Sequence, residues 1–333
     1  MILPPFRLHR PETVEQALLI AGDCGNDCDY VAGGTDLLPN YKNRLNHRRD
    51  VISLGRVASL SRSLHETEDG RLAVGAMCRL VDLERDPKVV EDLPGLHEAL
   101  TQIATPLIRV SGTIGGNQLV ETRCYYFNQS FDWRASKGFC MKADGDVCLV
   151  VPQKEICYAI YAGDTAPVLQ TLGASYVLIG YDGEREVAAE DFYRPDGIRK
   201  NVLTRGEILA AILFPARAAK AKSGYVKLRL RDSFDFPDMG VAASLWEEDG
   251  RVVDLRVSVT AVSMTPTLFP EVTDSLKGQP VGRDLVEHVA EEVRKRSMPV
   301  RNVLFPPAYR KRMVGVFTRR LLERLAGLGP RGG

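Results

Sequence analysis

The chain has 333 residues, of which 44% are hydrophobic and 26% charged, and its formal net charge at pH 7 is +1. This composition is typical of a globular protein, and the length predicts two or three domains. A near-zero net charge without a long basic run excludes the electrostatic footprint of a nucleic-acid-binding protein. No apolar segment approaches the length of a membrane span, and the first residues lack a signal-peptide pattern. We therefore expect a cytoplasmic protein with neither membrane nor nucleic-acid partners.

The first half of the chain alternates short strands with helices. An opening strand is followed by a helix that starts after Thr13, and Thr13 with Gln16 has the pattern of a capping box. Short apolar runs predict further strands, and apolar residues three to four positions apart predict helices. We expect strands at 29–31, 50–54 and 71–76, and helices at 37–44, 80–85, 89–92 and 96–108, the last with a break at Pro106.

The second half changes to hairpins. Strands are expected at 174–180 and 186–188 around an Asp-Gly turn at 182–183, and again at 208–214. A segment rich in alanine and lysine, 216–223, is interpreted as a linker. Beyond it we expect strands at 225–231, 241–246 and 252–262, and helices at 285–296 and 307–325.

Two phrases contain paired glycines and are interpreted as loops, the first of them between a predicted strand and a predicted helix. The first is Val31-Ala32-Gly33-Gly34-Thr35-Asp36-Leu37, and the second is Thr113-Ile114-Gly115-Gly116-Asn117. Glycine lets the backbone approach a ligand closely, and successive N–H groups at a helix start bind anions such as a pyrophosphate. A phrase of this kind alone is more often an ordinary turn, and two of them together are stronger evidence than one. The Gly-x-Gly-x-x-Gly motif of a Rossmann unit does not occur in the chain.

Four of the seven cysteines gather in one segment that contains no histidine. They are Cys124, Cys140, Cys148 and Cys157. In a reducing compartment, clustered thiols indicate metal or redox chemistry, and four thiolates suffice for one iron–sulfur cluster or one zinc ion. None of the four has the close cysteine neighbour typical of structural zinc sites, yet the spacing also differs from that of bacterial ferredoxins. The residues alone leave a cluster, zinc and unligated buried thiols as alternatives.

The remaining candidate residues predict no catalytic group. Cys24 and Cys28 lie in a turn rich in glycine and aspartate and are interpreted as ordinary thiols, and Cys78 is expected to be buried. The five histidines are scattered without ligand spacing. No nucleophile with a positioned base is found, so the chemistry is expected to belong to cofactors that the protein places and tunes.

The paired-glycine phrases are followed by Asp164 ahead of Pro167 and Leu169, and this order resembles a known family. The chain is similar to the FAD-binding medium subunits of the molybdenum hydroxylases, the relatives of xanthine dehydrogenase and carbon monoxide dehydrogenase. The segment 227–235 resembles the last domain of that family. The resemblance therefore covers nearly the whole chain.

The resemblance implies an α+β fold. A two-part FAD-binding domain of the PCMH (vanillyl-alcohol oxidase-like) type, not a Rossmann fold, would occupy residues 1–216, with subdomains at 1–54 and 55–216. A smaller α+β domain with an antiparallel sheet would occupy 223–327.

The resemblance also implies one FAD per chain. The paired-glycine phrases would hold its pyrophosphate and neighbouring groups, Asp164 its polyol chain, and Lys227 would lie near the cofactor. Ile103 and Leu213 would pack near the flavin ring. FAD contacts are thus expected from Val31, Ala32, Gly33, Gly34, Thr35, Asp36, Leu37, Ile103, Thr113, Gly116, Asn117, Asp164, Leu213 and Lys227.

In most of these relatives a short loop would separate Asn117 from Asp164. Here an insertion at about 120–160 lies between them and contains all four clustered cysteines. Such an insertion resembles that of the β subunits of the 4-hydroxybenzoyl-CoA reductase type, which carry a [4Fe–4S] cluster there. The resemblance thus favours a cluster held by Cys124, Cys140, Cys148 and Cys157.

The function implied is that of an electron-transfer subunit. Ferredoxin would deliver electrons through the cluster and FAD to a small [2Fe–2S] subunit and a large molybdopterin-binding subunit, where a phenolic hydroxyl is removed from an aryl-CoA thioester. A dimer of heterotrimers is the expected assembly. The alternatives are the medium FAD subunit of another molybdenum hydroxylase and a zinc-stabilised binding module whose glycine phrases are only turns.

Overall fold

The computed structural model describes residues 2–25, 27–45 and 47–329. Its N-terminal part is a three-stranded parallel sheet with the order β1-β3-β2, formed by β1 (Arg7–His9), β2 (Cys28–Val31) and β3 (Asp50–Ser53). Parallel neighbours need crossover connections, and α1 (Val14–Cys24) and α2 (Leu37–Lys42) lie in the two connections between these strands. Helix α1 begins as the sequence predicts, because the Thr13 hydroxyl accepts a hydrogen bond from the Gln16 N–H at 3.2 Å.

The second sheet has five antiparallel strands in the order β4-β5-β8-β6-β7. They are β4 (His65–Glu66), β5 (Leu72–Gly75), β6 (Ser175–Gly180), β7 (Gly183–Ala188) and β8 (Ile208–Phe214). Strand β8 lies in the middle and is almost entirely buried, as its unbroken apolar run predicts. The connection from β5 to β6 carries a series of short helices: α3 (Leu80–Glu84), α4 (Pro87–Asp92), α5 (Pro94–Gln102), α6 (Pro106–Ser111), α7 (Ile114–Gln118), α8 (Phe131–Ser136) and α9 (Ala166–Leu172).

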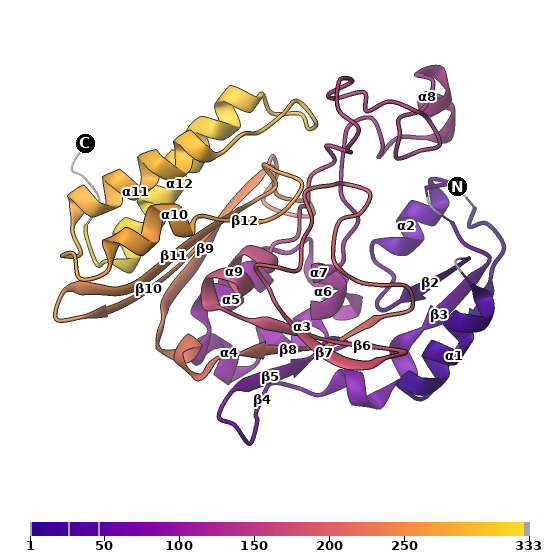
Figure 1. Cartoon of the computed structure of the whole chain (residues 1–333), viewed down its shortest axis with the longest axis horizontal. Coiled ribbons are helices and arrows are strands. Elements are labelled where there is room, and N and C mark those ends of the chain that lie inside the picture. Colours follow the sequence, from indigo (N-terminus) through magenta and orange to yellow (C-terminus); the bar gives the residue numbers. More distant parts are fainter. Residues whose placement is uncertain (1, 26, 46, 330–333) are drawn as a thin grey trace.

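The third sheet is antiparallel with the order β12-β11-β10-β9. Its strands are β9 (Lys222–Leu228), β10 (Met239–Glu248), β11 (Arg251–Thr260) and β12 (Thr267–Leu268). Helix α12 (Pro307–Leu325) contacts β9 and β10, α11 (Arg283–Arg296) packs on α12, and the short α10 (Pro270–Thr273) lies beside β11. Helices α5 and α9 of the preceding part also contact this sheet (Figure 1).

Side chains of β10 show that both faces of the third sheet are buried. Ala242 and Trp246 belong to the core shared with the second sheet, whereas Val241, Ala243 and Leu245 face the core made with α11 and α12. This alternation follows from the two-residue period of a strand. The two halves of the chain therefore share one continuous hydrophobic interface.

The segment 216–223, expected to be a linker, joins the second and third sheets and has regular structure of its own. Residues Ala216–Lys220 are a 3-10 helix, and β9 begins at Lys222, earlier than the strand predicted at 225–231. Alanine and lysine have low strand propensities, but the pairing of Lys222 with Leu245 of β10 extends the strand to Lys222.

None of the helices in the described part of the chain combines the length and apolar character needed to span a bilayer.

The cysteine-bearing insertion forms a lobe that extends beyond the sheets, with α8 on the side of α2 (Figure 1). Arg134 of α8 holds the lobe against the segment that follows α2. Its guanidinium donates hydrogen bonds to the backbone oxygens of Asn43 at 3.2 Å and Arg44 at 3.1 Å. At its base, Arg123 and Ile160 exchange backbone hydrogen bonds of 2.8 Å in both directions. The two ends of the insertion are therefore closed on each other.

Candidate functional site

A cavity of about 640 Å³ lies where the N-terminal sheet, α6, α7 and the start of β8 meet. All seven residues of the first paired-glycine phrase, Val31 to Leu37, line it. Ile103, Asp164 and four residues of the second phrase (Thr113, Gly115, Gly116, Asn117) also belong to the wall. The structure thus brings together three regions that are spread over more than a hundred residues of the sequence.

Gly33 is required by packing and Gly34 by backbone conformation. A Cβ atom on Gly33 would lie 1.8 Å from the backbone oxygen of Ser111, so the turn after β2 can touch the end of α6 only if this residue has no side chain. Gly34 has a φ of +71°, in the left-handed region that favours glycine. The two phrases also approach each other, since a Cβ on Gly116 would lie 3.9 Å from the Cβ of Ala32.

The two phrases differ in what their backbones can offer a ligand. The N–H groups of Gly33, Gly34, Thr35 and Asp36 make no hydrogen bond within the described part of the chain. In α7, by contrast, Ile114 donates to Cys78, Gly115 to Ala76 and Gly116 to the Thr113 hydroxyl. The first phrase is therefore the cradle that can bind an anion, whereas the second supplies a close-packed wall.

Asp164 lies in the cavity wall with a cation directly behind it. Its Oδ1 accepts a hydrogen bond of 2.8 Å from the Tyr225 hydroxyl and lies 3.0 Å from the Lys227 ammonium, which also donates to the Gln102 oxygen at 2.9 Å. Burial raises the pKa of Asp164 and lowers that of Lys227, and each charge opposes the shift of the other. Lys227 therefore holds Asp164 in place without itself lining the cavity.

Leu213 lies away from the cavity. It packs in the core below the N-terminal sheet, farther along β8 than Ile208 and Leu209, which both line the cavity although they face different cores. Residues 209 and 213 would share a face in a regular strand, but the pairing of β8 with β6 shifts register between Val177 and Leu178. This irregularity reverses the alternation along β8.

Several wall residues have no sequence motif that could have revealed them. Glu121 binds the Lys142 ammonium at 2.6 Å and the Lys200 ammonium at 3.2 Å, and Phe234 and Phe236 project from the loop after β9. The Arg123 guanidinium lies 4.0 Å from the centre of the Phe236 ring. These contacts join the insertion, residue 200 and the third sheet around the cavity, and only the fold creates them.

The four clustered cysteines are all buried and near one another. Cys124 and Cys157 pack with Cys140 and Phe127 in one small hydrophobic cluster. Burial raises the pKa of Cys124 to about 12, and the neighbouring thiols of Cys157, Cys140 and Cys148 add to the shift. All four cysteines belong to the described part of the chain, and no three of their sulfurs lie within 4.8 Å of one another.

Comparison with protein families decides the identity of the fold. Residues 4–217 match the family model described as the FAD binding domain in molybdopterin dehydrogenase, and residues 224–325 match the CO dehydrogenase flavoprotein C-terminal domain. The chain belongs to the FAD-binding subunits of the molybdopterin dehydrogenases. The α+β fold expected from the sequence, with a flavin domain followed by a domain built on an antiparallel sheet, is confirmed.

Relatives of this family match nearly the whole chain. The carbon monoxide dehydrogenase medium chain of Afipia carboxidovorans is 28% identical over 97% of this chain and 98% of its own length. The aldehyde oxidoreductase FAD-binding subunit PaoB of Escherichia coli is 32% identical over 74% of this chain and 80% of its own length. In the solved structure of reconstituted CO dehydrogenase from Oligotropha carboxidovorans, one chain superposes with a TM-score of 0.81 at 26% identity, covering 99% of this chain and 100% of that one.

The geometry of the cavity fits the FAD of a molybdopterin dehydrogenase subunit. The free N–H groups after β2 suit a pyrophosphate, and Ile103 and Leu209 give an apolar wall for a ring system. Gly33 permits the close backbone approach that such a cradle needs. The family binds FAD, and this cavity has the chemistry to hold that cofactor.

Proposed function

We propose that the chain is the FAD- and [4Fe–4S]-carrying electron-transfer subunit of a molybdenum-dependent reductase similar to 4-hydroxybenzoyl-CoA reductase. Its partners would be a large molybdopterin-binding subunit, a small [2Fe–2S] subunit and ferredoxin as the electron donor, in a dimer of heterotrimers. The observation that carries the proposal is the burial of Cys124, Cys140, Cys148 and Cys157 together in a lobe whose base forms part of the cavity wall. A bound cluster would supply one-electron transfer beside a flavin that exchanges one or two electrons.

The spread of the four thiols supports a cluster over zinc. Tetrahedral zinc with Zn–S bonds of about 2.3 Å holds its sulfurs only about 3.8 Å apart. In the described part of the chain, no three sulfurs of the insertion all lie within 4.8 Å of one another, so they are not gathered as a zinc ion would hold them. A four-iron cluster fits a wider arrangement because each cysteine binds a different iron atom.

The electrostatics of the lobe also support an anionic occupant. The Lys142 side chain is only 4% exposed, and its ammonium lies 4.7 Å from the centre of the Phe127 ring in the cysteine cluster. Burial raises the pKa of Cys157 to about 11, and Lys142 opposes that rise, so the cation favours the thiolate form that ligates metal. Because Lys142 also binds Glu121 in the cavity wall, one buried network connects the thiols to the flavin cavity.

Exposed apolar side chains on the lobe support the proposal that a protein donates the electrons. Tyr125, Phe131, Val147 and Ile156 are all solvent-exposed apolar side chains of the insertion. Exposed aromatic residues of this kind are enriched in protein–protein interfaces. A ferredoxin docked here would lie beside the four buried thiols.

Similarity to the dehydrogenases favours a second candidate, the medium FAD subunit of an oxidising molybdenum hydroxylase. The carbon monoxide dehydrogenase relatives match over the whole chain, and in such an assembly electrons would leave through FAD. In this case zinc could occupy the four cysteines as a purely structural ion. Family membership leaves no place for a flavin-free binding module.

Cofactor analysis of the anaerobically purified chain tests the proposal. We expect one FAD together with four iron and four sulfide per chain, with iron lost and FAD retained in a Cys148→Ser variant. Cys78→Ser, which changes a buried thiol outside the lobe, is the matched control and should keep its iron. Stoichiometric zinc without iron would contradict the cluster and favour the second candidate.

Stopped-flow reduction by ferredoxin tests the direction of electron flow. The Cys148→Ser variant should keep FAD but lose rapid flavin reduction, because the route from the donor is interrupted. Flavin reduction by ferredoxin at the wild-type rate in this variant would show that the four-cysteine lobe lies off the electron path.

A further inference from the structure

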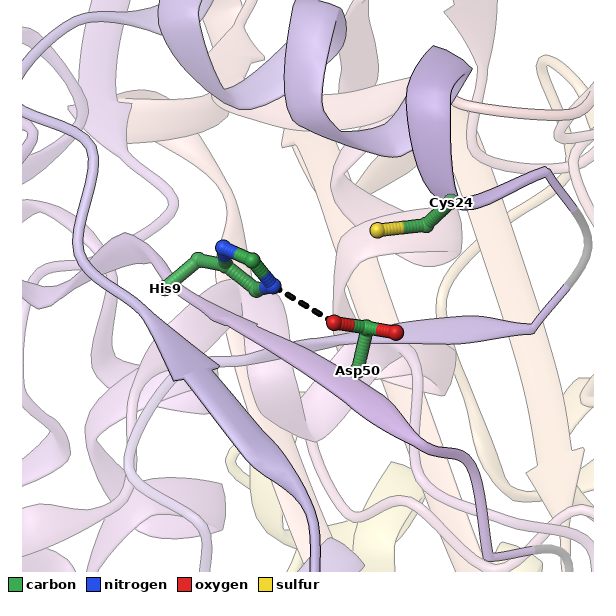
Figure 2. A group of neighbouring side chains, drawn as sticks. All are labelled: His9, Cys24 and Asp50. Atoms are coloured by element: carbon green, nitrogen blue, oxygen red, sulfur yellow. Dashed lines mark hydrogen bonds and ion pairs between the residues drawn. The ribbon is translucent and has the colours of Figure 1, made fainter.

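Three side chains with metal-binding atoms converge in the N-terminal subdomain (Figure 2). His9 ends β1, Cys24 ends α1 and Asp50 begins β3. The His9 ring nitrogen, the Cys24 sulfur and a carboxylate oxygen of Asp50 all lie within 4.8 Å of one another. In the described part of the chain, no other group of three such residues meets this criterion.

Within this group of three, the short hydrogen bond joins only His9 and Asp50. The His9 Nε2 atom lies 2.6 Å from Asp50 Oδ1, and Arg7 donates to Asp50 Oδ2 at 2.7 Å, so both fasten β1 to β3. The Cys24 sulfur is directed toward the space between the imidazole and the carboxylate (Figure 2), and its thiol can add only a weak S–H hydrogen bond to Asp50. Imidazole, thiolate and carboxylate facing one point are, in contrast, the ligand types that zinc takes in proteins.

We propose that His9, Cys24 and Asp50 bind one zinc ion, with solvent in the fourth position, and that the ion clamps β1 and α1 to β3. Zinc bonds of about 2.0–2.3 Å in a tetrahedron need donor atoms roughly 3.3–3.6 Å apart. The His9–Asp50 pair must therefore open by under about 1 Å, which a side-chain rotation supplies. The fourth position is accessible because the His9 side chain is 29% exposed.

The surroundings already hold the carboxylate as a metal ligand requires. Arg7 binds Oδ2 of Asp50 while Oδ1 faces His9, so a metal could take Oδ1 without displacing the arginine. The Asp50 side chain is only 4% exposed, which fixes its orientation. Cys28 is not part of the set, since its sulfur is directed at the backbone oxygens of Gly25 at 3.8 Å and Ala21 at 4.0 Å.

Zinc binding by the full chain tests this site separately from the four-cysteine lobe. The anaerobic protein is incubated with zinc chloride, passed through gel filtration and analysed for zinc, iron and FAD. We expect one zinc per chain beyond any metal in the lobe, and its loss in Cys24→Ser and His9→Gln variants with iron and FAD unchanged. A cobalt-substituted sample should show thiolate-to-cobalt absorption that Cys24→Ser removes.

Cys28→Ser is the matched control because it removes the neighbouring thiol of the same turn, and it should retain the zinc. The site would be disproved if Cys24→Ser and His9→Gln kept the same zinc content as the parent protein. Zinc lost from Cys140→Ser but not from Cys24→Ser would place the ion in the lobe, which would overturn this site and also the cluster assignment.

Discussion

The ammonium of Lys227 lies 3.0 Å from Oδ1 of Asp164, and both side chains are almost completely removed from solvent. Lys227 comes from β9 of the third sheet, whereas Asp164 precedes α9 and lines the flavin cavity. Breaking a buried ion pair by removing one partner leaves an uncompensated charge, which is far more costly than removing both. The C-terminal sheet therefore helps to set the charge and position of a residue in the cavity wall.

Replacement of Lys227 by methionine should destabilise the protein by about 3–5 kcal/mol, because Asp164 then remains buried without its cation. FAD content should fall as well. The double variant Asp164→Asn, Lys227→Met should recover most of the lost stability. Urea unfolding followed by circular dichroism, with the flavin-to-protein absorbance ratio, measures both effects.

Lys222→Met is the matched control, since Lys222 lies on the same strand and pairs with Glu247 at the surface. An exposed pair of this kind contributes about 0–1 kcal/mol. Equal losses of stability in the two lysine variants, or a double variant no better than Lys227→Met, would contradict the role given to the buried pair.

Gly33→Ala should abolish FAD binding although it adds a single methyl group. The new Cβ would meet the Ser111 oxygen at 1.8 Å, so the turn after β2 must move and its free N–H groups lose their alignment. Gly282→Ala is the control, because nothing lies within 4 Å of a Cβ at that position. Flavin fluorescence released on denaturation gives the FAD content, and normal content in Gly33→Ala would refute the cradle.

The sequence pattern was sufficient to predict an element's bounds where the residues of one segment determine its conformation. Strand 208–214 and helix 307–325 were predicted with the bounds that the structure has, because an unbroken apolar run before Pro215 and a proline at a helix start mark these elements. The first glycine phrase could be recognised for the same reason. Its turn geometry and its ligand-facing N–H groups belong to consecutive residues.

Contacts between segments that are far apart in the sequence could not be predicted from local patterns. Leu213 was expected near the flavin ring, but only Ile208 and Leu209 at the start of β8 line the cavity, and Leu213 lies farther along the strand in the core. Cys24 was interpreted as an ordinary thiol because its neighbours His9 and Asp50 approach it only after the parallel sheet has formed. The Lys142–Glu121–Lys200 network depends on three loops and has no spacing in the sequence.

Glu121 should make the free energy of unfolding depend on pH in the acidic range. Burial alone would raise its pKa, but Lys200 and Lys142 together lower it from the usual 4.5 to about 2. A lowered pKa in the folded state stabilises the protein above the unfolded value, and this stabilisation is lost as the pH falls from about 4.5 towards 2. The contribution is at most about 3.5 kcal/mol at neutral pH, at about 1.4 kcal/mol per pKa unit.

Glu121→Gln should therefore lower the free energy of unfolding at pH 7 and flatten its decline below pH 4.5. Urea unfolding at a series of pH values compares this variant with the parent chain and with Glu91→Gln, an exposed glutamate of α4. Parallel pH curves for Glu121→Gln and the parent would show that the network does not stabilise the charged carboxylate.

The last prediction concerns the attachment of the lobe to the flavin domain through Arg134. This buried side chain reaches three backbone oxygens, those of Gln129 at 2.7 Å, Arg44 at 3.1 Å and Asn43 at 3.2 Å. Arg134→Met keeps the length of the side chain but removes these charge-assisted hydrogen bonds, each worth about 1.5–3 kcal/mol. Hydrogen exchange in residues 37–45 and 124–157 should become faster, because α2 and the lobe are no longer held together.

Flavin content should stay unchanged in Arg134→Met, since the first glycine phrase precedes the attachment point and keeps its own packing against Ser111. Iron bound in the lobe should be released faster to a chelator under anaerobic conditions. Lys137→Met, an exposed lysine just after α8, is the control and should exchange like the parent chain. Unchanged exchange in Arg134→Met would mean that the base of the lobe, where Arg123 and Ile160 pair, is enough to hold it.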